Sequence, residues 1–303
     1  MHAQRSFRFG VVAGQARSGP EWIDIARRAE ALGYSTLLIP DTLGPTLAPL
    51  PALGFAAAAT ETIRLGTFVL ANDMRNPVLV ARECATIDFL SGGRLELGLG
   101  AGRPTAGDDH RKLSIPFESG GTRVERLAEA LTIIKALLSG QTTSAAGSHY
   151  TIDGADMFPR PIQQPHPPIM VAAGGRRLLA LAAREADIVA LAIQASEPLA
   201  AFEERVGWLR QQAGERFEQL ELSQNLVAVG DQMPQWLVRS GLALSQLAAA
   251  KSPVALIGTT DQMCEQLLER RERLGISYIA VSAELMEALA PVVSQLQGIG
   301  DGG

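Results

Sequence analysis

Two hydrophobic periodicities alternate along the chain. Short apolar runs such as Phe7–Val12 and Thr36–Ile39 have the length and composition of strands that are buried on both faces. Between these runs, segments such as Pro77–Leu90 carry apolar residues at i, i+3 and i+4, the spacing of helices that bury one side. The same pattern predicts further strands at Arg64–Leu70, Arg94–Leu99, Ile169–Ala172, Ile188–Ala192, Leu220–Val229 and Tyr278–Val281. It predicts further helices at Glu21–Leu32, Thr122–Leu138, Arg177–Glu185, Leu199–Ala213 and Thr260–Leu274.

Eight predicted strands separated mostly by helices define the fold class. Strands that are buried on both faces and joined through helices form parallel sheets. The first four strands begin at residues 7, 36, 64 and 94, a nearly constant step that is typical of a (β/α)8 barrel. An open doubly wound sheet instead needs a G-x-G-x-x-G turn after its first strand, and Gly10–Gly14 lacks it. We therefore predict an α/β protein, a (β/α)8 TIM barrel that forms a single domain over residues 1–303, with a frayed end at 301–303.

Three insertions interrupt the regular barrel pattern. Residues 101–121 follow the fourth strand and residues 230–259 follow the seventh, so both are expected over the C-terminal face, where barrels carry their sites. Residues 140–168 follow the fourth helix and start at the opposite end. They predict a small hairpin made of Thr142–Ser144 and His149–Ile152, and then a stiff proline-rich strap.

Composition excludes several classes of function. The 27 basic and 32 acidic residues give a net charge of −5, and no Lys/Arg cluster offers a footprint for a nucleic-acid backbone. Cys84 and Cys264 are too few for a disulfide framework or a zinc site, so we expect buried free thiols in a reducing compartment. No stretch approaches 18 uninterrupted apolar residues, and we expect no signal peptide. We therefore predict a cytoplasmic protein whose partners include neither nucleic acid nor a membrane.

The residues that close each predicted strand are the candidates for chemistry in a barrel. They include Asp41 and Thr42 after the second strand, Asn72 after the third, and Ala101 and Gly102 after the fourth. These strand ends contain no His, no Cys and no pair of carboxylates, so we expect no metal, thiol-nucleophile or glycosidase chemistry. They are instead rich in Gly and Ala, which suits a flat ring that approaches the backbone closely. We infer that a cofactor carries the reaction on a small-molecule substrate.

The segment Ala172–Arg177 has the pattern of an anion site. A strand leads into Gly174 and Gly175 and then into a helix, whose free N–H groups and dipole attract an anion. Arg176 and Arg177 oppose the helix dipole unless an anion lies between them and the helix. A phosphate site is one hypothesis for these four residues, and a plain tight turn is the other.

Three further features each admit two interpretations. Asp41 either accepts a hydrogen bond from a ring N–H or caps a turn. The alternate glycines of Gly98–Gly102 either belong to a cofactor site or allow the loop to pack closely. His110 either reaches over the site or belongs to a solvated charge cluster, Asp108–Lys112, and we favour the cluster. In the insertion 230–259 we expect three apolar residues to pack a lid rather than to bind a ring: Met233, Trp236 and Leu237.

Longer phrases of the sequence resemble one known family. The phrases AEALGYSTLLIPD and PIMVAAGGRRLLALAAREADIVAL, and the run Ser91–Arg94 followed by Glu96–Gly100, are similar to the luciferase-like monooxygenase superfamily. The resemblance extends from Phe7 to about Leu296, and it is greatest to the oxidoreductases that depend on the deazaflavin coenzyme F420. It implies a (β/α)8 barrel that is commonly dimeric and holds a flavin or deazaflavin ring at its C-terminal mouth. We therefore expect a homodimer.

The resemblance also assigns residues to the cofactor. It implies that Asp41 lies near the pyrimidine edge of the ring and that a non-proline cis peptide joins Phe68 to Val69 behind it. It further implies that the helix start after the fifth strand binds the phosphate. With the strand ends, the expected cofactor-binding set is Asp41, Phe68, Val69, Asn72, Ala101, Gly102, Gly174, Gly175, Arg176 and Arg177.

Two positions depart from the family pattern. Deazaflavin dehydrogenases commonly have a catalytic His directly after the Asp, where this chain has Thr42, and often Glu or Trp where it has Arg103. Our candidate catalytic residues are therefore Asp41, Thr42 and Arg103. A proton would come from Thr42, from Asp41 or from solvent, and Arg103 would clamp a carboxylate or enolate with its charged fork.

Three functions stay open at this point. The leading hypothesis is hydride transfer between F420 and an activated C=C bond or imine. The second is a two-component monooxygenase that uses reduced FMN and oxygen, and the third is a flavin-binding barrel without turnover. F420 carries an oligoglutamate tail that FMN lacks. Arg111, Lys112 and Lys251 could meet such a tail, although ordinary surface charge explains them equally well.

Overall fold

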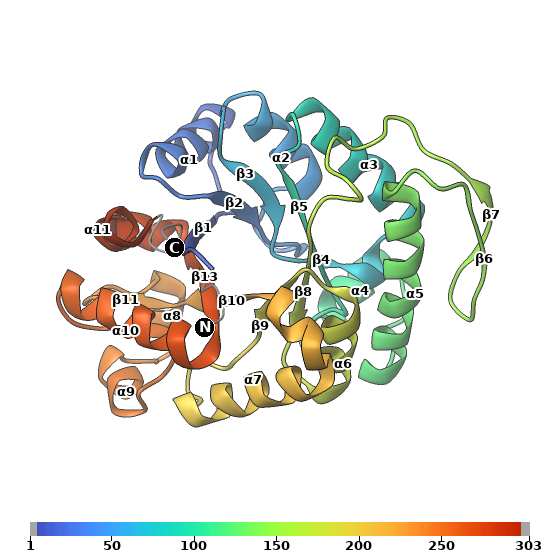
Figure 1. The fold of residues 1–303 in the computed structure, drawn as a ribbon. Coiled ribbons are helices and arrows are strands. Elements are labelled where there is room, and N and C mark those ends of the chain that lie inside the picture. Colours follow the sequence, from blue (N-terminus) through green and yellow to red (C-terminus); the bar gives the residue numbers. More distant parts are fainter. Residues whose placement is uncertain (1–4, 298–303) are drawn as a thin grey trace. The chain divides into compact units, whose positions relative to one another are not determined.

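The computed structural model describes residues 5–297, so the predicted frayed end at 301–303 lies outside the described residues. Parallel strands and helices alternate along the chain as they do in a (β/α)8 barrel, which confirms the predicted fold class (Figure 1). The barrel strands are β1 (Arg8–Val12), β2 (Thr36–Ile39), β3 (Arg64–Thr67) with its continuation β4 (Leu70–Ala71), β5 (Leu95–Gly100), β8 (Ile169–Ala173), β9 (Ile188–Leu191), β10 (Glu221–Leu226) and β13 (Ile276–Ser282). The helices are α1 (Gly19–Ala31), α2 (Pro49–Ala57), α3 (Pro77–Leu90), α4 (Gly107–Leu113), α5 (Gly120–Leu138), α6 (Arg176–Glu185), α7 (Leu199–Ala213), α8 (Gln235–Arg239), α9 (Leu244–Ala249), α10 (Thr260–Leu274) and α11 (Met286–Leu296).

Internal contacts divide the chain into two compact units. Unit 1 comprises residues 1–13, 24–37 and 173–303, and unit 2 comprises residues 14–23 and 38–172. Both units draw on separate stretches of the sequence, so no single linker divides them. The predicted single domain over residues 1–303 stays a prediction.

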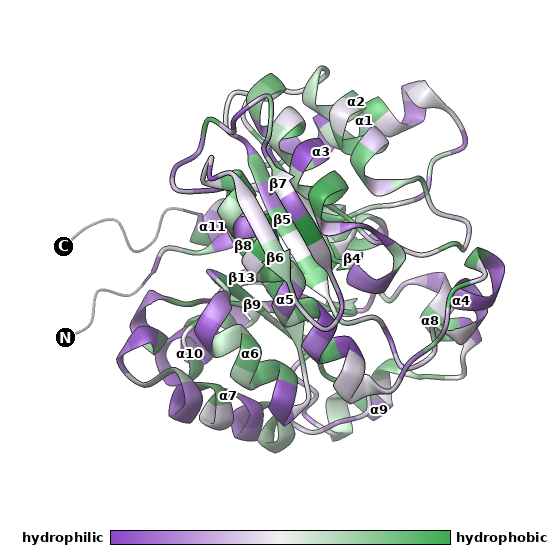
Figure 2. Cartoon of the chain, turned by 90° about the vertical axis from the view of Figure 1, so that its right-hand side faces the viewer, coloured by the Kyte–Doolittle hydropathy of each residue, from purple (hydrophilic) through white to green (hydrophobic). Residues whose placement is uncertain are grey.

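In unit 1, four parallel strands lie next to one another in the order β9, β10, β13 and β1. The side chains of Val11 and Val281 are fully buried at paired positions of β1 and β13. Hydrophilic residues lie on the outer sides of α6, α7 and α10 in Figure 2, as expected for helices that bury one face. The capping box of Thr259 and Gln262 starts α10, and Gly275 ends it at a φ of +77°.

In unit 2, β5 pairs with β3, β4 and β8. Leu65, Leu95 and Leu97 are fully buried along these strands. The side chain of Asn76 accepts a hydrogen bond from the Val78 N–H at 2.9 Å, and Pro77 occupies the first turn, so α3 begins where the sequence predicts.

Two predicted strands are interrupted. The strand expected at Arg64–Leu70 ends at Thr67 and resumes at Leu70, and the peptide Phe68–Val69 between the two parts is cis, as the resemblance implies. The strand expected at Leu220–Val229 ends at Leu226 because the Val227 N–H donates to the carbonyl of Val254 at 2.7 Å. A short parallel pair follows, formed by β11 (Ala228–Val229) and β12 (Ala255–Leu256).

The hairpin predicted after the fourth helix is present, with shifted ends. Its strands are β6 (Thr143–Ala146) and β7 (Thr151–Ala155), and Figure 1 shows them beside α5. The carboxylate of Glu129 on α5 accepts hydrogen bonds from three successive N–H groups of the turn, at Ser148, His149 and Tyr150. This anchor explains why the turn lies later than the sequence predicts.

Other predictions about packing have mixed outcomes. Cys84 and Cys264 are buried free thiols, which confirms the expectation. In the insertion 230–259, Leu237 is buried and Met233 packs against the small core around Leu247. Trp236 is 59% exposed, so its predicted packing role was wrong. Within residues 5–297, no helix combines the length and the apolar composition needed to cross a membrane.

Candidate functional site

Asp41 follows β2 and lies in unit 2, where its side chain accepts hydrogen bonds from the segment that begins at β4. Its side chain is 5% exposed. One carboxylate oxygen accepts from the Ala71 N–H and the other from the Arg75 guanidinium group, both at 3.0 Å. Asp41 thereby fixes the end of β4 and the turn that follows. Oδ2, which accepts from Ala71, also forms an ion pair with Nη1 of Arg75 at 2.9 Å, whereas Oδ1 retains a second lone pair. The predicted contact of Asp41 with a ring stays a prediction.

Two glycines of β5 make room for the interrupted strand. A Cβ atom at Gly98 would lie 2.0 Å from the carbonyl oxygen of Thr67 and 2.8 Å from the side chain of Val69. A Cβ atom at Gly100 would lie 2.8 Å from the same valine. Because such distances are far below van der Waals contact, β5 can pair here only with glycine at both positions. This confirms close packing as the role of these two glycines.

Thr42 occupies the position where the resemblance expects a histidine, and its hydroxyl group is fully engaged. It accepts hydrogen bonds from the Gly44 N–H at 3.1 Å and from the Arg103 guanidinium group at 3.3 Å. It donates its own proton to Oδ2 of Asp109 at 3.3 Å. Arg103 also forms an ion pair with that oxygen at 3.3 Å, and Lys112 lies 4.0 Å from the other oxygen. The structure therefore brings two predicted catalytic residues, Thr42 and Arg103, onto one carboxylate.

His110 corrects the prediction of a solvated charge cluster. Its side chain is buried, with Nε2 2.9 Å from Oδ2 of Asp73 and Nδ1 2.9 Å from the carbonyl oxygen of Ala106. Both ring nitrogens therefore face acceptors, and a protonated ring satisfies both and forms an ion pair with Asp73. The ring edge also packs on Phe117 at a centroid distance of 4.8 Å. Only the outer residues of the cluster, such as Asp108, are solvated.

Ala101 and Gly102 hold a buried arginine. Nη1 of Arg123 donates to the carbonyl of Ala101 at 2.9 Å, and its guanidinium group lies over the ring of Phe117 at 4.5 Å. Gly102 has a φ of +77°, and a Cβ atom there would lie 2.9 Å from Nη1. Arg123 therefore requires glycine at this strand end. The predicted contact of Ala101 and Gly102 with a cofactor is compatible with this role and stays a prediction.

Asn72 is buried at the turn after β4. Its amide group donates to the hydroxyl of Tyr150 at 3.3 Å, and burial raises the pKa of that tyrosine. The neighbouring Asp73 has one buried carboxylate oxygen, Oδ1, without a hydrogen-bond partner among the described residues. An unpartnered buried acceptor is costly and marks a position where a donor group would be favoured.

The predicted anion site lies in unit 1 and has an open helix start. Gly175 is the N-cap of α6 and offers no side chain to the first-turn N–H groups. A Cβ atom at Gly175 would meet nothing within 4 Å, whereas one at Gly174 would lie 3.0 Å from the carbonyl of Ala192. Arg176 stacks over the ring of Trp208 at 4.3 Å, and Arg177 is exposed. Gly174 thus has a packing role, and phosphate binding stays a prediction.

Sequence reasoning missed four buried charged residues of unit 2. The side chain of Asp73 is 2% exposed, and Asp109, His110 and Arg123 are at most 8% exposed. A usable signal was present in α4, because Ala106, Asp109 and His110 have the spacing i, i+3 and i+4 of one buried helix face. The high charge of the segment concealed that periodicity.

The fold and these strand-end residues define a class of protein, the (β/α)8 barrels that build a site from the loops after their strands. The sequence model of the luciferase-like monooxygenase family matches residues 6–235, well over half of the chain. The chain therefore belongs to the luciferase-like monooxygenase family.

Curated relatives resemble part of the chain. It is 33% identical over 189 residues to an F420-dependent glucose-6-phosphate dehydrogenase of Microbacterium testaceum, which covers 59% of this chain and 55% of that one. It is 35% identical over 167 residues to the enzyme of the same name from Beutenbergia cavernae, which covers 52% and 48%. The matches thus span about half the length of these relatives.

Solved structures resemble the whole chain. The F420-dependent tetrahydromethanopterin reductase from Methanopyrus kandleri superposes with a TM-score of 0.78 at 18% identity, covering 97% of this chain and 100% of that one. An F420-dependent secondary alcohol dehydrogenase has a TM-score of 0.75 at 18% identity, with coverages of 97% and 100%. The monooxygenase RslO1 from Streptomyces bottropensis has a TM-score of 0.72 at 22% identity, with coverages of 95% and 97%. At these identities the likeness establishes the fold.

Proposed function

We propose that this chain is an oxidoreductase that transfers a hydride between coenzyme F420 and a small organic substrate. The observation that carries the proposal is the network in which Thr42 directs its hydroxyl proton to Asp109 beside Arg103. Such a network can exchange a proton with a substrate, which hydride transfer requires. The names of the curated relatives support F420 as the cofactor.

The residues fit such a cofactor in two places. In unit 2, Asp41, Asn72 and the backbone of Phe68–Val69 would hold the ring. The unpartnered carboxylate oxygen of Asp73 could accept a further hydrogen bond there. In unit 1, the N–H groups at the start of α6 have no side-chain cap and would bind a phosphate at Gly174–Arg177. When bound, F420 supplies a carbon that accepts or donates hydride.

The chain itself handles the proton. Asp109 is 7% exposed and accepts from the Thr42 hydroxyl and from Arg103, so its charge is balanced and its orientation fixed. A substrate oxygen or nitrogen that takes the place of the 3.3 Å hydrogen bond from Arg103 would exchange its proton through this hydroxyl with the Asp109 carboxylate. We propose that this relay replaces the histidine of the family pattern.

The substrate is proposed from the same residues. Arg103 is 60% exposed and would place a permanent positive charge over an enolate or carboxylate, which favours reduction of an activated C=C bond or imine. Alcohol oxidation is the second candidate, because the side chain of Asp109, paired with Arg103 and hydrogen-bonded to Thr42, would accept the proton of the alcohol. The names of the relatives and of one structural neighbour agree with that second candidate.

The first test is the dissociation constant of the purified protein for F420 and for FMN, each oxidised and reduced. Micromolar or tighter binding of F420 with weak FMN binding is the expected result. The reverse preference would favour the FMN-dependent monooxygenase. F420 binding without turnover of any enone, imine or alcohol would favour the flavin-binding barrel.

The second test uses variants. Asp109→Asn is expected to lower turnover by about 10²- to 10⁴-fold, the usual contribution of general acid–base catalysis. Arg103→Ala is expected to lower turnover with cofactor affinity little changed, and Arg82→Ala at an exposed position of α3 is the control. Unchanged turnover in Asp109→Asn would refute the relay. The predicted homodimer also stays a proposal, which size-exclusion chromatography with light scattering tests.

A further inference from the structure

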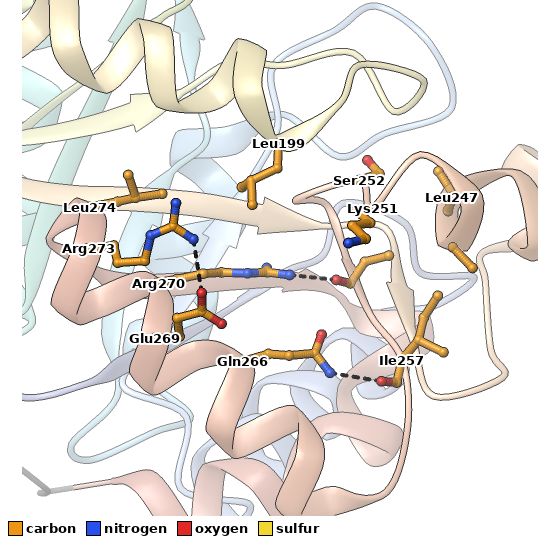
Figure 3. A pocket seen from close by; sticks show the side chains of 12 residues that line it. Leu199, Leu247, Lys251, Ser252, Ile257, Gln266, Glu269, Arg270, Arg273 and Leu274 are labelled. Carbon is orange, nitrogen blue, oxygen red and sulfur yellow. Dashed lines mark hydrogen bonds and ion pairs between the residues drawn. The ribbon is translucent and has the colours of Figure 1, made fainter.

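A cavity of about 300 Å³ lies in unit 1, and Lys251, which could also meet a cofactor tail, is the one residue of its lining considered above for the cofactor. Figure 3 shows it between α10, the turn after α9 and the start of α7. Its apolar lining comes mainly from Leu199, Leu247 and Ala255, and Leu247 is 1% exposed. The cavity therefore offers an apolar wall that belongs to the core of the insertion 230–259.

Two cations face this cavity without a carboxylate partner. Arg270 donates from Nη1 to the carbonyl of Pro253 at 2.6 Å and from Nη2 to that of Ala255 at 2.9 Å. Neither Arg270 nor Lys251 forms an ion pair with any residue of 5–297. Burial lowers the pKa of Arg270 to about 10, although the nearby charge of Glu269 acts in the opposite direction. In Figure 3 the ammonium group of Lys251 and the guanidinium group of Arg270 point toward one another.

The charge balance of the lining is positive. Lys251, Arg270 and Arg273 face one carboxylate, Glu269, so the lining carries two more cations than anions. Glu269 pairs with Arg273 at 2.9 Å, and its charge also raises the pKa of Arg270. Arg273 has a second partner outside the lining, Glu203 at 2.5 Å. Lys251 is exposed to solvent and Arg270 is partly buried, and the excess of positive charge in the lining favours an anionic ligand over a neutral one.

The backbone at Lys251 adds a second unusual feature. Lys251 follows the C-cap of α9, Ala250, and has a φ of +47°, in the left-handed region that few non-glycine residues adopt. Such a conformation costs about 1–2 kcal/mol in a residue with a Cβ atom. A glycine would adopt it freely, so the backbone conformation does not account for a lysine at this position.

We propose that this cavity binds a small amphipathic carboxylate, with the carboxylate group between Lys251 and Arg270 and the apolar body against Leu199, Leu247 and Ala255. A volume of about 300 Å³ accommodates roughly ten non-hydrogen atoms, at about 30 Å³ each in a liquid. Octanoate has that size and is the probe. The site is additional to the proposed F420 chemistry and does not depend on it.

The charge test is calorimetric titration of the full chain with octanoate and with octanol, which has the same chain and no charge. Octanoate is expected to bind at least about tenfold more tightly, the value of one charge-assisted hydrogen bond. Lys251→Gln is expected to weaken octanoate binding about tenfold, while Arg239→Gln, an exposed cation of the same insertion, leaves it unchanged. Equal affinities for octanoate and octanol, or equal effects of the two variants, would overturn the proposal.

The volume test uses Ala248→Trp, which fills the cavity from an exposed position of α9 and leaves both cations in place. It is expected to abolish octanoate binding while circular dichroism and the unfolding midpoint stay unchanged. Binding that survives this variant, or no octanoate binding at millimolar concentration in the unmodified chain, would refute the site. Saturating F420 is expected to leave octanoate affinity unchanged. Competition between the two would assign the cavity to the cofactor tail and overturn a separate carboxylate site, whereas failure of F420 binding alone would leave it intact.

Discussion

Replacing His110 by glutamine isolates the buried ion pair that attaches α4 to unit 2. The side chains of His110 and Asp73 are 1% and 2% exposed. His110 supplies the hydrogen bond to one carboxylate oxygen of Asp73, and the other oxygen has no partner among residues 5–297. The variant therefore leaves a carboxylate without its counter-ion in a site that water does not reach.

The size of the effect follows from that geometry. Removing one member of a buried ion pair costs about 3–5 kcal/mol, because the remaining charge is uncompensated. That is a large part of a stability of about 5–15 kcal/mol. Because α4 has only seven residues, local detachment of the segment 101–121 requires less free energy than global unfolding, and we expect the variant to promote it. We therefore expect amide hydrogen exchange in α4 to accelerate at least about 100-fold, which corresponds to about 3 kcal/mol.

Hydrogen exchange followed by mass spectrometry measures this effect, with Arg111→Gln as the control on the exposed side of α4. The double variant Asp73→Asn with His110→Gln removes both charges and is expected to exchange more slowly than His110→Gln alone. Additive effects of the two substitutions, or unchanged exchange in His110→Gln, would refute the ion pair. A ¹⁵N spectrum of labelled histidine is an independent check, because it should show both nitrogens of His110 protonated.

Three further predictions concern other parts of the chain. Gly98→Ala is expected to destabilise the protein by at least about 1–3 kcal/mol in urea unfolding, because its Cβ atom would lie 2.0 Å from a backbone carbonyl oxygen. The control Gly54→Ala should not destabilise it, because a Cβ atom there would have no atom within 4 Å. Burial raises the pKa of both Cys84 and Cys264, so neither thiol should react with a disulfide reagent near neutral pH until the chain unfolds. Burial alone would raise the pKa of Glu129, but the backbone N–H groups of the hairpin turn lower it. Its contribution to stability is therefore present above about pH 4.3 and lost as the pH falls further, a loss that Glu129→Gln should remove from the pH dependence of unfolding.

Most of the barrel could be predicted from the sequence because its strands and helices differ in hydrophobic period. The bounds of α3, α7 and α10 agree with the prediction residue for residue, since Pro, Gly and capping side chains mark helix ends. Helix α2 escaped prediction because it is apolar on every side and has no helical period. Helices α8 and α9 are too short to show one.

The strand interruption at Phe68–Val69 was expected only from the family resemblance. Nothing in the apolar run Arg64–Leu70 indicates it. The matching feature, glycine at 98 and 100, is visible in the sequence, but its meaning depends on the strand that lies beside it. A pairing between strands that are 30 residues apart cannot be read from either strand alone.

The proton relay shows what a sequence cannot reveal about a site of this kind. The departure from the family pattern at Thr42 was visible, but the compensating residue, Asp109, lies 67 positions away on a helix whose sequence is mostly charged. The high charge of this segment predicts that its side chains are exposed to solvent, and this prediction is correct for Asp108 and Arg111. Asp109 and His110 are buried because Arg103 and Asp73 neutralise them, and these partners become neighbours only when the loop after β5 folds back. A buried carboxylate needs a counter-ion to be stable in the interior, and such a residue is a candidate for function. Only the contacts seen in the structure identify it. The experiment on Asp109→Asn therefore tests the part of the site that the structure, and not the sequence, identifies.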